Sequence, residues 1–124
     1  AFRQRVIYTG YVSDNDLNSL YNGALVFVLP SFCEGFGLPA LEAMSCGTVV
    51  IGSSTTSIPE VIGDAGLFFD PRNTAELVTR LTEVIDNGQL REELGRRALQ
   101  RAATFSWQRS AQETLQVFQD LNAQ

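Results

Sequence analysis

The segment from Ala24 to Gly47 restricts the fold of this chain more than any other. An apolar run from Ala24 to Leu29 stops at Pro30, a loop with two glycines follows, and Pro39 opens a short helix that ends before Gly47. A continuous apolar run bounded by turn residues is typical of a strand buried on both faces of a parallel sheet. The segment therefore predicts a strand, a glycine loop and a helix in succession, a unit from which α/β domains are built.

The loop in this segment has features of a ligand-binding loop. Such loops lie at the carboxyl edge of parallel sheets, and the free N–H groups of a helix start can hold a phosphate or an anionic sugar substituent. Glu34 and Glu42 lie on either side of the bend. Because each carboxylate oxygen accepts several hydrogen bonds, the pair predicts two acceptors around one small ligand that carries hydroxyls. The residue pattern equally allows Glu34 to stabilise the helix dipole and Glu42 to be a solvated surface residue.

The rest of the chain alternates strands and helices. Three more segments predict strands: Arg5–Gly10, Thr48–Gly52 and Leu67–Phe69. Five segments besides the one after Pro39 predict helices: Asp16–Tyr21, Pro59–Ile62, Asn73 or Thr74 to about Asn87, Leu90–Ala103 and Trp107–Leu121. This alternation predicts a parallel sheet layered by helices.

Apolar spacing predicts which helix faces point inward. The stripes are Leu17, Leu20 and Tyr21 in the first helix, and Leu77, Leu81 and Ile85 in the helix that Gly88 is expected to end. Ser106 is predicted to cap the last helix and Trp107 to anchor it to the core, in preference to stacking on a ligand.

Composition narrows the class of protein. The length of 124 residues and the 44% hydrophobic content fit one globular domain, and the net charge of −5 argues against nucleic-acid binding. The chain has no histidine, which removes histidine bases and ligands, and its two cysteines, Cys33 and Cys46, are expected to be reduced and partly buried. No apolar stretch is as long as a membrane span, so the expected location is the cytoplasm.

Two glutamates separated by seven residues form a recognisable motif. Glu34 and Glu42 enclose a Gly-Phe-Gly-Leu-Pro bend, after Pro30-Ser31 and before Gly47. This segment resembles the E-x7-E motif of retaining GT-B glycosyltransferases, specifically family 4. The resemblance extends from Val6 to Phe118 through three further landmarks in the family order. These are Pro59 to Leu67, Asp70-Pro71 and Phe105-Ser106-Trp107.

The resemblance implies a fold and a donor site. The fold would be α/β, a Rossmann-like three-layer parallel sheet of about four strands with flanking helices, and residues 1–124 would be part of a C-terminal nucleotide-sugar-binding domain. Glu34 would be the catalytic residue and contact the donor-sugar hydroxyls, and Glu42 would hold the ribose hydroxyls. The amides that line the sugar and diphosphate would be those of Gly35, Phe36, Gly37 and Leu38.

The resemblance also implies the reaction. A sugar would pass from a nucleotide-diphosphate sugar to a glycan, lipid or small-molecule acceptor with retention of configuration, by front-face attack in which the departing diphosphate helps to take the acceptor proton. Glu34 would orient the donor and stabilise charge. No metal or other cofactor is implied. A non-catalytic nucleotide-sugar-binding or assembly module is the alternative, and a sugar-nucleotide epimerase or phosphorylase of similar fold is a more remote one.

This chain departs from the family pattern in several places. Thr56-Ser57-Ile58 replaces a frequent pair of glycines, and Val49 stands where proline is frequent. The family's Arg and Lys that grip the diphosphate, and its N-terminal acceptor domain, would lie upstream of the first strand. We therefore expect this chain alone to be inactive, its partners to be the donor and that acceptor domain, and the full-length protein to make peripheral contact with the inner face of the membrane.

The order of strands in this fold determines what could pair with the predicted first strand, Arg5–Gly10. In the order 3-2-1-4-5-6, two strands absent from this chain would lie between Arg5–Gly10 and Ala24–Leu29. Either these two segments pair directly in a four-stranded sheet, or another copy of the chain covers the exposed edge and forms a homo-oligomer.

Two polar clusters can each be interpreted as purely structural or as part of a binding surface. The stretch with Arg96, Arg97 and Arg101 is expected to be a solvated helix face rather than a basic patch for a membrane or partner domain, because Glu92 and Glu93 lie beside it. The hydroxyl run Ser53–Ser57 either touches the donor or only forms a turn.

Overall fold

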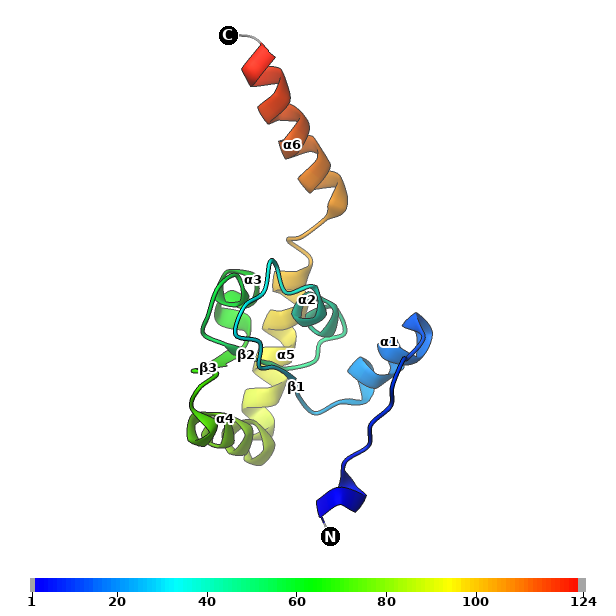
Figure 1. Cartoon of the computed structure of the whole chain (residues 1–124), viewed down its shortest axis with the longest axis vertical. Helices are drawn as coiled ribbons and strands as arrows, with labels where there is room; N and C mark the ends of the chain where they lie inside the picture. The colour runs from blue at the N-terminus through cyan, green and yellow to red at the C-terminus, as the bar shows by residue number, and fades with distance from the viewer. Residues whose placement is uncertain (1, 123–124) are drawn as a thin grey trace.

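Three short parallel strands form the sheet of the computed structural model, which describes residues 2–122 (Figure 1). They are β1 (Phe27–Leu29), β2 (Val50–Ser53) and β3 (Leu67–Phe69), in the order β1-β2-β3. Phe27 pairs with Val50, and Ile51 pairs with Leu67. Because parallel neighbours need a crossover, the chain between β1 and β2 carries a helix, and so does the chain between β2 and β3.

Helices surround this sheet and continue beyond it. The α-helices are α1 (Asp14–Gly23), α2 (Leu38–Ser45), α3 (Ile58–Ile62), α4 (Thr74–Asp86), α5 (Gly88–Ala102) and α6 (Trp107–Asn122), and the 3₁₀ turns are η1 (Phe2–Arg5) and η2 (Gly63–Ala65). The predicted strand at Leu67–Phe69 and the helices after Pro39, Pro59 and Asn73 are confirmed, as is the cap at Ser106, whose hydroxyl accepts from the Arg109 N–H at 3.1 Å.

The core consists of two apolar clusters. The first contains Met44, Val50 and Ile62, and the second contains Ile51 and Val84, with helix α5 contributing residues to both. The successive β2 residues Val50 and Ile51 enter different clusters, so the central strand is covered on both faces. The predicted α/β three-layer arrangement is confirmed, with three strands instead of about four.

The predicted strand at Arg5–Gly10 is wrong. Phe2–Arg5 is a 3₁₀ turn, and the following residues run without regular structure, with Val6, Ile7 and Tyr8 at least 75% exposed. Strand preference is largely a preference for packing and pairing with neighbours. Because no strand of the described chain pairs with this segment, direct pairing with β1 is ruled out. Coverage of the exposed edge by a second copy stays a prediction.

Several inward faces also differ from the prediction. Leu20 is 50% exposed, and in α4 it is Val84, not Ile85, that is fully buried. Strand β1 lies at the edge of the sheet, and Leu25 before it is exposed. Gly88 begins α5 instead of ending α4, because Asn87 caps the new helix through its side chain. For Leu20, Ile85 and Leu25, the neighbouring elements rather than local spacing decide which residue is covered.

Helix α6 projects from the body of the molecule (Figure 1). Within residues 107–122 it has no buried residue, and Trp107 is 81% exposed. The predicted anchoring role of Trp107 is therefore wrong. Just before this helix, the rings of Phe105 and Phe36 meet edge to face at a centroid distance of 5.9 Å.

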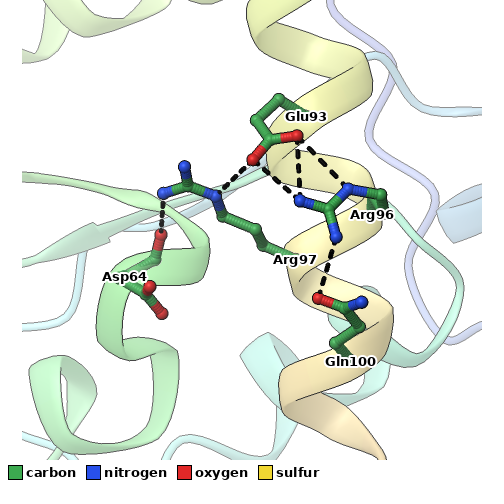
Figure 2. A network of polar contacts seen from close by, with 5 residues as sticks. All are labelled: Asp64, Glu93, Arg96, Arg97 and Gln100. Carbon is green, nitrogen blue, oxygen red and sulfur yellow. Dashed lines mark hydrogen bonds and ion pairs between the residues drawn. The ribbon is translucent and has the colours of Figure 1, made fainter.

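The arginines of α5 are largely satisfied by their neighbours. Figure 2 shows Arg96 and Arg97 converging on Glu93, with Arg97 also donating to the carbonyl oxygen of Asp64 at 3.4 Å. The hydrogen bonds from Arg96 and then Arg97 lower the pKa of Glu93. Surface pairs of this kind contribute little stability. For Arg96 and Arg97, the predicted solvated helix face is confirmed.

Two other arginines of α5 bind the ends of earlier helices. Arg101 donates to the carbonyl oxygens of Glu60 and Val61 near the end of α3, at 2.6 and 3.1 Å, and its guanidinium stacks on Phe105. Arg91 donates to two carbonyls in the last turn of α4. Cations at helix ends satisfy orphan carbonyls and complement the helix dipole. Arg101 is therefore not part of a free basic face.

Replacing Gly95 by alanine should destabilise the fold, although alanine is normally favoured over glycine inside a helix. Helix propensity alone favours alanine by about 1 kcal/mol. A Cβ at Gly95, however, would lie 2.7 Å from the carbonyl oxygen of Gly47, which belongs to the backbone and has little room to move. Overpacking typically costs about 1–3 kcal/mol. We therefore expect the free energy of unfolding, measured with urea, to fall by about 1 kcal/mol.

Gly88→Ala is the matched control on the same helix. A Cβ there would meet only the flexible end of Arg91, at 3.6 Å. Its urea midpoint should not fall below that of the parent protein. A Gly95→Ala protein as stable as the Gly88→Ala protein would contradict the close packing of α5 against the end of α2.

Candidate functional site

The loop between β1 and α2 ends in a left-handed turn. Gly37, the N-cap of α2, has φ of 98° and ψ of 42°, a conformation that strongly favours glycine. The N–H groups of Ala40 and Leu41 donate to its carbonyl oxygen. Among the described residues, no acceptor is recorded for the N–H groups of the four residues before Pro39. These are the predicted site residues Gly35, Phe36, Gly37 and Leu38. The loop thus presents several backbone donors near a helix start.

Glu34 is half-buried at the beginning of this loop. Its carboxylate accepts a hydrogen bond from the Ser31 hydroxyl at 2.6 Å. Its backbone is also fixed, because its N–H donates to the Thr56 hydroxyl at 3.1 Å and its carbonyl accepts from Ser57 at 2.9 Å. The residue is therefore held from both sides while one carboxylate oxygen keeps its acceptor sites.

The hydroxyl run after β2 is the partner of the first loop. Ser53 and Thr55 both donate to the carbonyl oxygen of Ser31, at 2.6 and 3.3 Å. Thr56 adopts a positive φ of 52°, which is uncommon for a residue with a Cβ. The two loops therefore lie at the same edge of the sheet, and the hydroxyls hold the loop that carries Glu34.

Glu42 lies on the second turn of α2 and faces α1. It is exposed, and its Oε2 accepts a hydrogen bond from the Tyr21 hydroxyl at 3.1 Å. Burial, followed by this hydrogen bond, raises the pKa of Tyr21 to about 12. A cavity of about 320 Å³ opens between the two helices, lined by Asp14, Leu17, Asn18, Tyr21, Glu42, Ser45 and Cys46.

The two cysteines are both free thiols. Cys46 is half-buried and donates to the Asn18 side-chain oxygen at 3.2 Å. Cys33 is exposed, so the expectation that both thiols are partly buried holds only for Cys46.

The structure gives the two glutamates separate surroundings. Glu34 is held by hydroxyls of the two loops, whereas Glu42 is held by a phenol from α1. That both surround one ligand stays a prediction. Sequence reasoning missed Ser31, Thr56 and Tyr21 as their partners. The run of small hydroxyl residues after β2 was the available signal for Thr56, while nothing local indicated that Tyr21 would reach Glu42.

A second, apolar cavity lies beside the glycine loop. It has a volume of about 380 Å³ and is lined by Phe36, Leu38, Leu41, Phe105, Ser106, Trp107 and Ser110. Its walls come from the loop, α2 and the start of α6. Trp107 is therefore a lining residue of this cavity instead of a core anchor.

Two kinds of feature are absent from the described part of the chain. Residues 2–122 contain no group of three or more cysteine, aspartate or glutamate side chains arranged to hold a metal ion. None of the helices in that range combines the length and the apolar character needed to cross a membrane.

Residues 2–101 match the family model described as glycosyl transferases group 1. Among curated proteins, the chain is 46% identical over 111 residues to O-antigen chain mannosyltransferase B of Escherichia coli, with 90% of this chain and 29% of that protein covered. It is 40% identical over 116 residues to the serotype-specific mannosyltransferase WbdA of Escherichia coli, with 94% of this chain and 14% of that protein covered. The chain thus spans less than a third of either relative.

A solved structure shares the fold. Sucrose-phosphate synthase from Thermosynechococcus elongatus superposes with a TM-score of 0.86 at 30% sequence identity, over 97% of this chain and 31% of that one. The sequence match and the shared parallel sheet with flanking helices agree. The chain therefore belongs to the glycosyl transferases group 1 family and has the Rossmann-like fold of a GT-B domain.

Proposed function

We propose that this chain supplies the donor-binding part of a retaining glycosyltransferase, which transfers a sugar from a nucleotide-diphosphate sugar to an acceptor. The observation that carries the proposal is the loop from Glu34 to Leu38, where free backbone N–H groups follow a firmly held carboxylate. Such donors suit the diphosphate and the sugar oxygens, and a carboxylate suits the sugar hydroxyls. The names of the two relatives support sugar transfer and make mannose the first sugar to test.

The proposal assigns distinct tasks to the two glutamates. Glu34 orients the donor sugar and stabilises charge that develops at the reacting carbon, and Glu42 accepts hydrogen bonds from the ribose hydroxyls. The N–H groups of Gly35, Phe36, Gly37 and Leu38 line the sugar and diphosphate. The acceptor site and the cations that neutralise the diphosphate are supplied by the rest of the full-length protein. That protein is proposed to act in the cytoplasm, at the inner face of the membrane where the acceptor is a lipid.

Replacing Glu42 by alanine tests the ribose assignment. In the full-length protein, UDP-, GDP- and ADP-sugars are screened by calorimetry, and the best ligand is measured again with Glu42→Ala. Hydrogen bonds to a charged group contribute about 1.5–3 kcal/mol, so the affinity should fall about tenfold to a hundredfold. Chelation of divalent ions by EDTA should leave the affinity of the parent protein unchanged.

Glu92 offers a matched control for this experiment. It is an exposed glutamate of α5 and is not among the residues that line the cavity beside Glu42. Glu92→Ala should bind the same nucleotide sugar as tightly as the parent protein. Undiminished affinity in Glu42→Ala would remove Glu42 from the donor site.

A further inference from the structure

Tyr21 is held rigidly between α2 and the sheet. Tyr21 is only 8% exposed, and its ring meets that of Phe27 in β1 edge to face at a centroid distance of 5.3 Å. Its backbone carbonyl accepts a hydrogen bond of 2.6 Å from the buried hydroxyl of Thr48. With both the ring and the backbone fixed, the phenol hydroxyl occupies a defined position at the rim of the cavity between α1 and α2.

That hydroxyl acts on an otherwise exposed carboxylate. A glutamate side chain loses rotamer entropy when it is fixed, and an exposed residue such as Glu42 would lose this entropy on binding a ligand. The bond from Tyr21 engages Oε2 of Glu42 at 3.1 Å. Because each carboxylate oxygen has two acceptor positions, the other oxygen and part of Oε2 remain available.

The phenol can only be the donor in this pair. A carboxylate accepts hydrogen bonds and donates none. Since burial and the Glu42 contact raise the pKa of Tyr21 to about 12, the phenol keeps its proton through the neutral pH range. The orientation that it imposes on Glu42 is therefore independent of pH in that range.

We propose that Tyr21 is a positioning residue for nucleotide binding, which holds the Glu42 carboxylate so that its free acceptor positions receive the vicinal hydroxyls of the ribose. This inference rests on the proposed function, because it requires Glu42 to contact the ribose. It adds α1 to the donor site. The cavity between α1 and α2, whose lining includes Asn18 and Ser45, then accommodates the nucleoside part of the donor.

Tyr21→Phe in the full-length protein tests this role. The substitution removes the hydroxyl and keeps the ring that packs on Phe27. Affinity is measured by calorimetry for UDP, GDP or ADP, whichever binds best, and for its 2′,3′-dideoxy analogue. Because Tyr21 acts on the ribose only through Glu42, its loss should matter less than the loss of Glu42 itself, and binding of the ribonucleotide should weaken about threefold to tenfold. Binding of the dideoxy analogue should change less than twofold.

A double-variant cycle separates positioning from a general structural effect. If Tyr21 acts through Glu42, Tyr21→Phe should add no further loss of ribonucleotide affinity to Glu42→Ala. Tyr11→Phe is the matched control, because Tyr11 is 94% exposed and its hydroxyl should not affect binding. Equal losses for the ribonucleotide and its dideoxy analogue, full additivity in the cycle, or no loss at all in Tyr21→Phe would each overturn the inference.

The same data distinguish the two proposals. If Glu42→Ala loses affinity for the ribonucleotide but not for the dideoxy analogue, the ribose assignment of Glu42 stands. An unchanged Tyr21→Phe protein would then reject only the role of Tyr21. If Glu42→Ala shows no preference between the two nucleotides, the ribose assignment itself fails, and the role of Tyr21 fails with it.

Discussion

Replacing Glu34 by alanine in the full-length protein should lower kcat by about 10²–10³-fold while leaving the affinity for the free nucleoside diphosphate unchanged. The reason is that a preorganised group near the reacting centre acts mainly on the transition state, where removal of one such group costs about 2.7–4 kcal/mol. Glu34 is suited to preorganisation because Ser31 holds its carboxylate and Thr56 receives its N–H. Initial rates of sugar transfer and calorimetric binding of the nucleoside diphosphate measure the two quantities separately.

Two comparisons make the Glu34 result interpretable. Glu34→Gln keeps an acceptor for the Ser31 hydroxyl while it removes the charge, so a large loss of kcat in this variant would assign the effect to charge. Glu92→Ala should retain full turnover. If Glu34→Ala also turns over at the parental rate, Glu34 takes no part in the reaction. A parent protein that binds nucleotide sugars without any transfer would favour the alternative, a non-catalytic binding module.

Replacing Gly66 by alanine should be the most destabilising of the glycine substitutions proposed for this chain. Gly66 precedes β3, and a Cβ there would lie 2.5 Å from the carbonyl oxygen of Val50 and 2.7 Å from a methyl carbon of Ile62. Val50 belongs to the central strand, which is paired on both sides. Its carbonyl group therefore cannot move away from the added Cβ without disturbing the sheet. Overpacking against such an atom should cost about 2–3 kcal/mol, out of total stabilities of about 5–15 kcal/mol.

Urea unfolding followed by circular dichroism measures this loss. Gly23→Ala is the matched control, because a Cβ at Gly23 would meet nothing within 4 Å. The Gly66→Ala protein should unfold at a markedly lower urea concentration than the Gly23→Ala protein. Equal midpoints would mean that the backbone at Val50 relaxes freely, contrary to its place in the sheet.

Local chemistry made much of the fold predictable. Pro39 and Pro59 lie in the first turns of α2 and α3, Asn73 caps α4 through its side chain, and Asp70 follows β3. These residues act through their own backbone preferences or through bonds to residues a few positions away. For that reason their effects can be predicted without knowledge of the tertiary structure.

Several predictions that failed depended on a distant partner. The segment from Arg5 to Gly10 has strand-forming residues but no strand beside it, and Trp107 has the character of an anchor but lies on a helix that projects from the body. In α4, Ile85 fits the apolar spacing, yet Val84 is the residue that the neighbouring elements cover. Propensity and spacing describe what a residue favours, whereas burial depends on what packs against it.

For the candidate site, the sequence alone determined the glycine loop and the positions of Glu34 and Glu42, because the E-x7-E spacing and the bend are continuous in the chain. Only the tertiary structure decided how each carboxylate is held. Thr56 reaches the backbone of Glu34 across 22 positions, and Tyr21 reaches Glu42 across 21. Parallel strands bring their loops together only after the crossovers have folded, and α1 meets α2 only by packing. The identity of the two glutamates is therefore local information, while their orientation is a property of the fold.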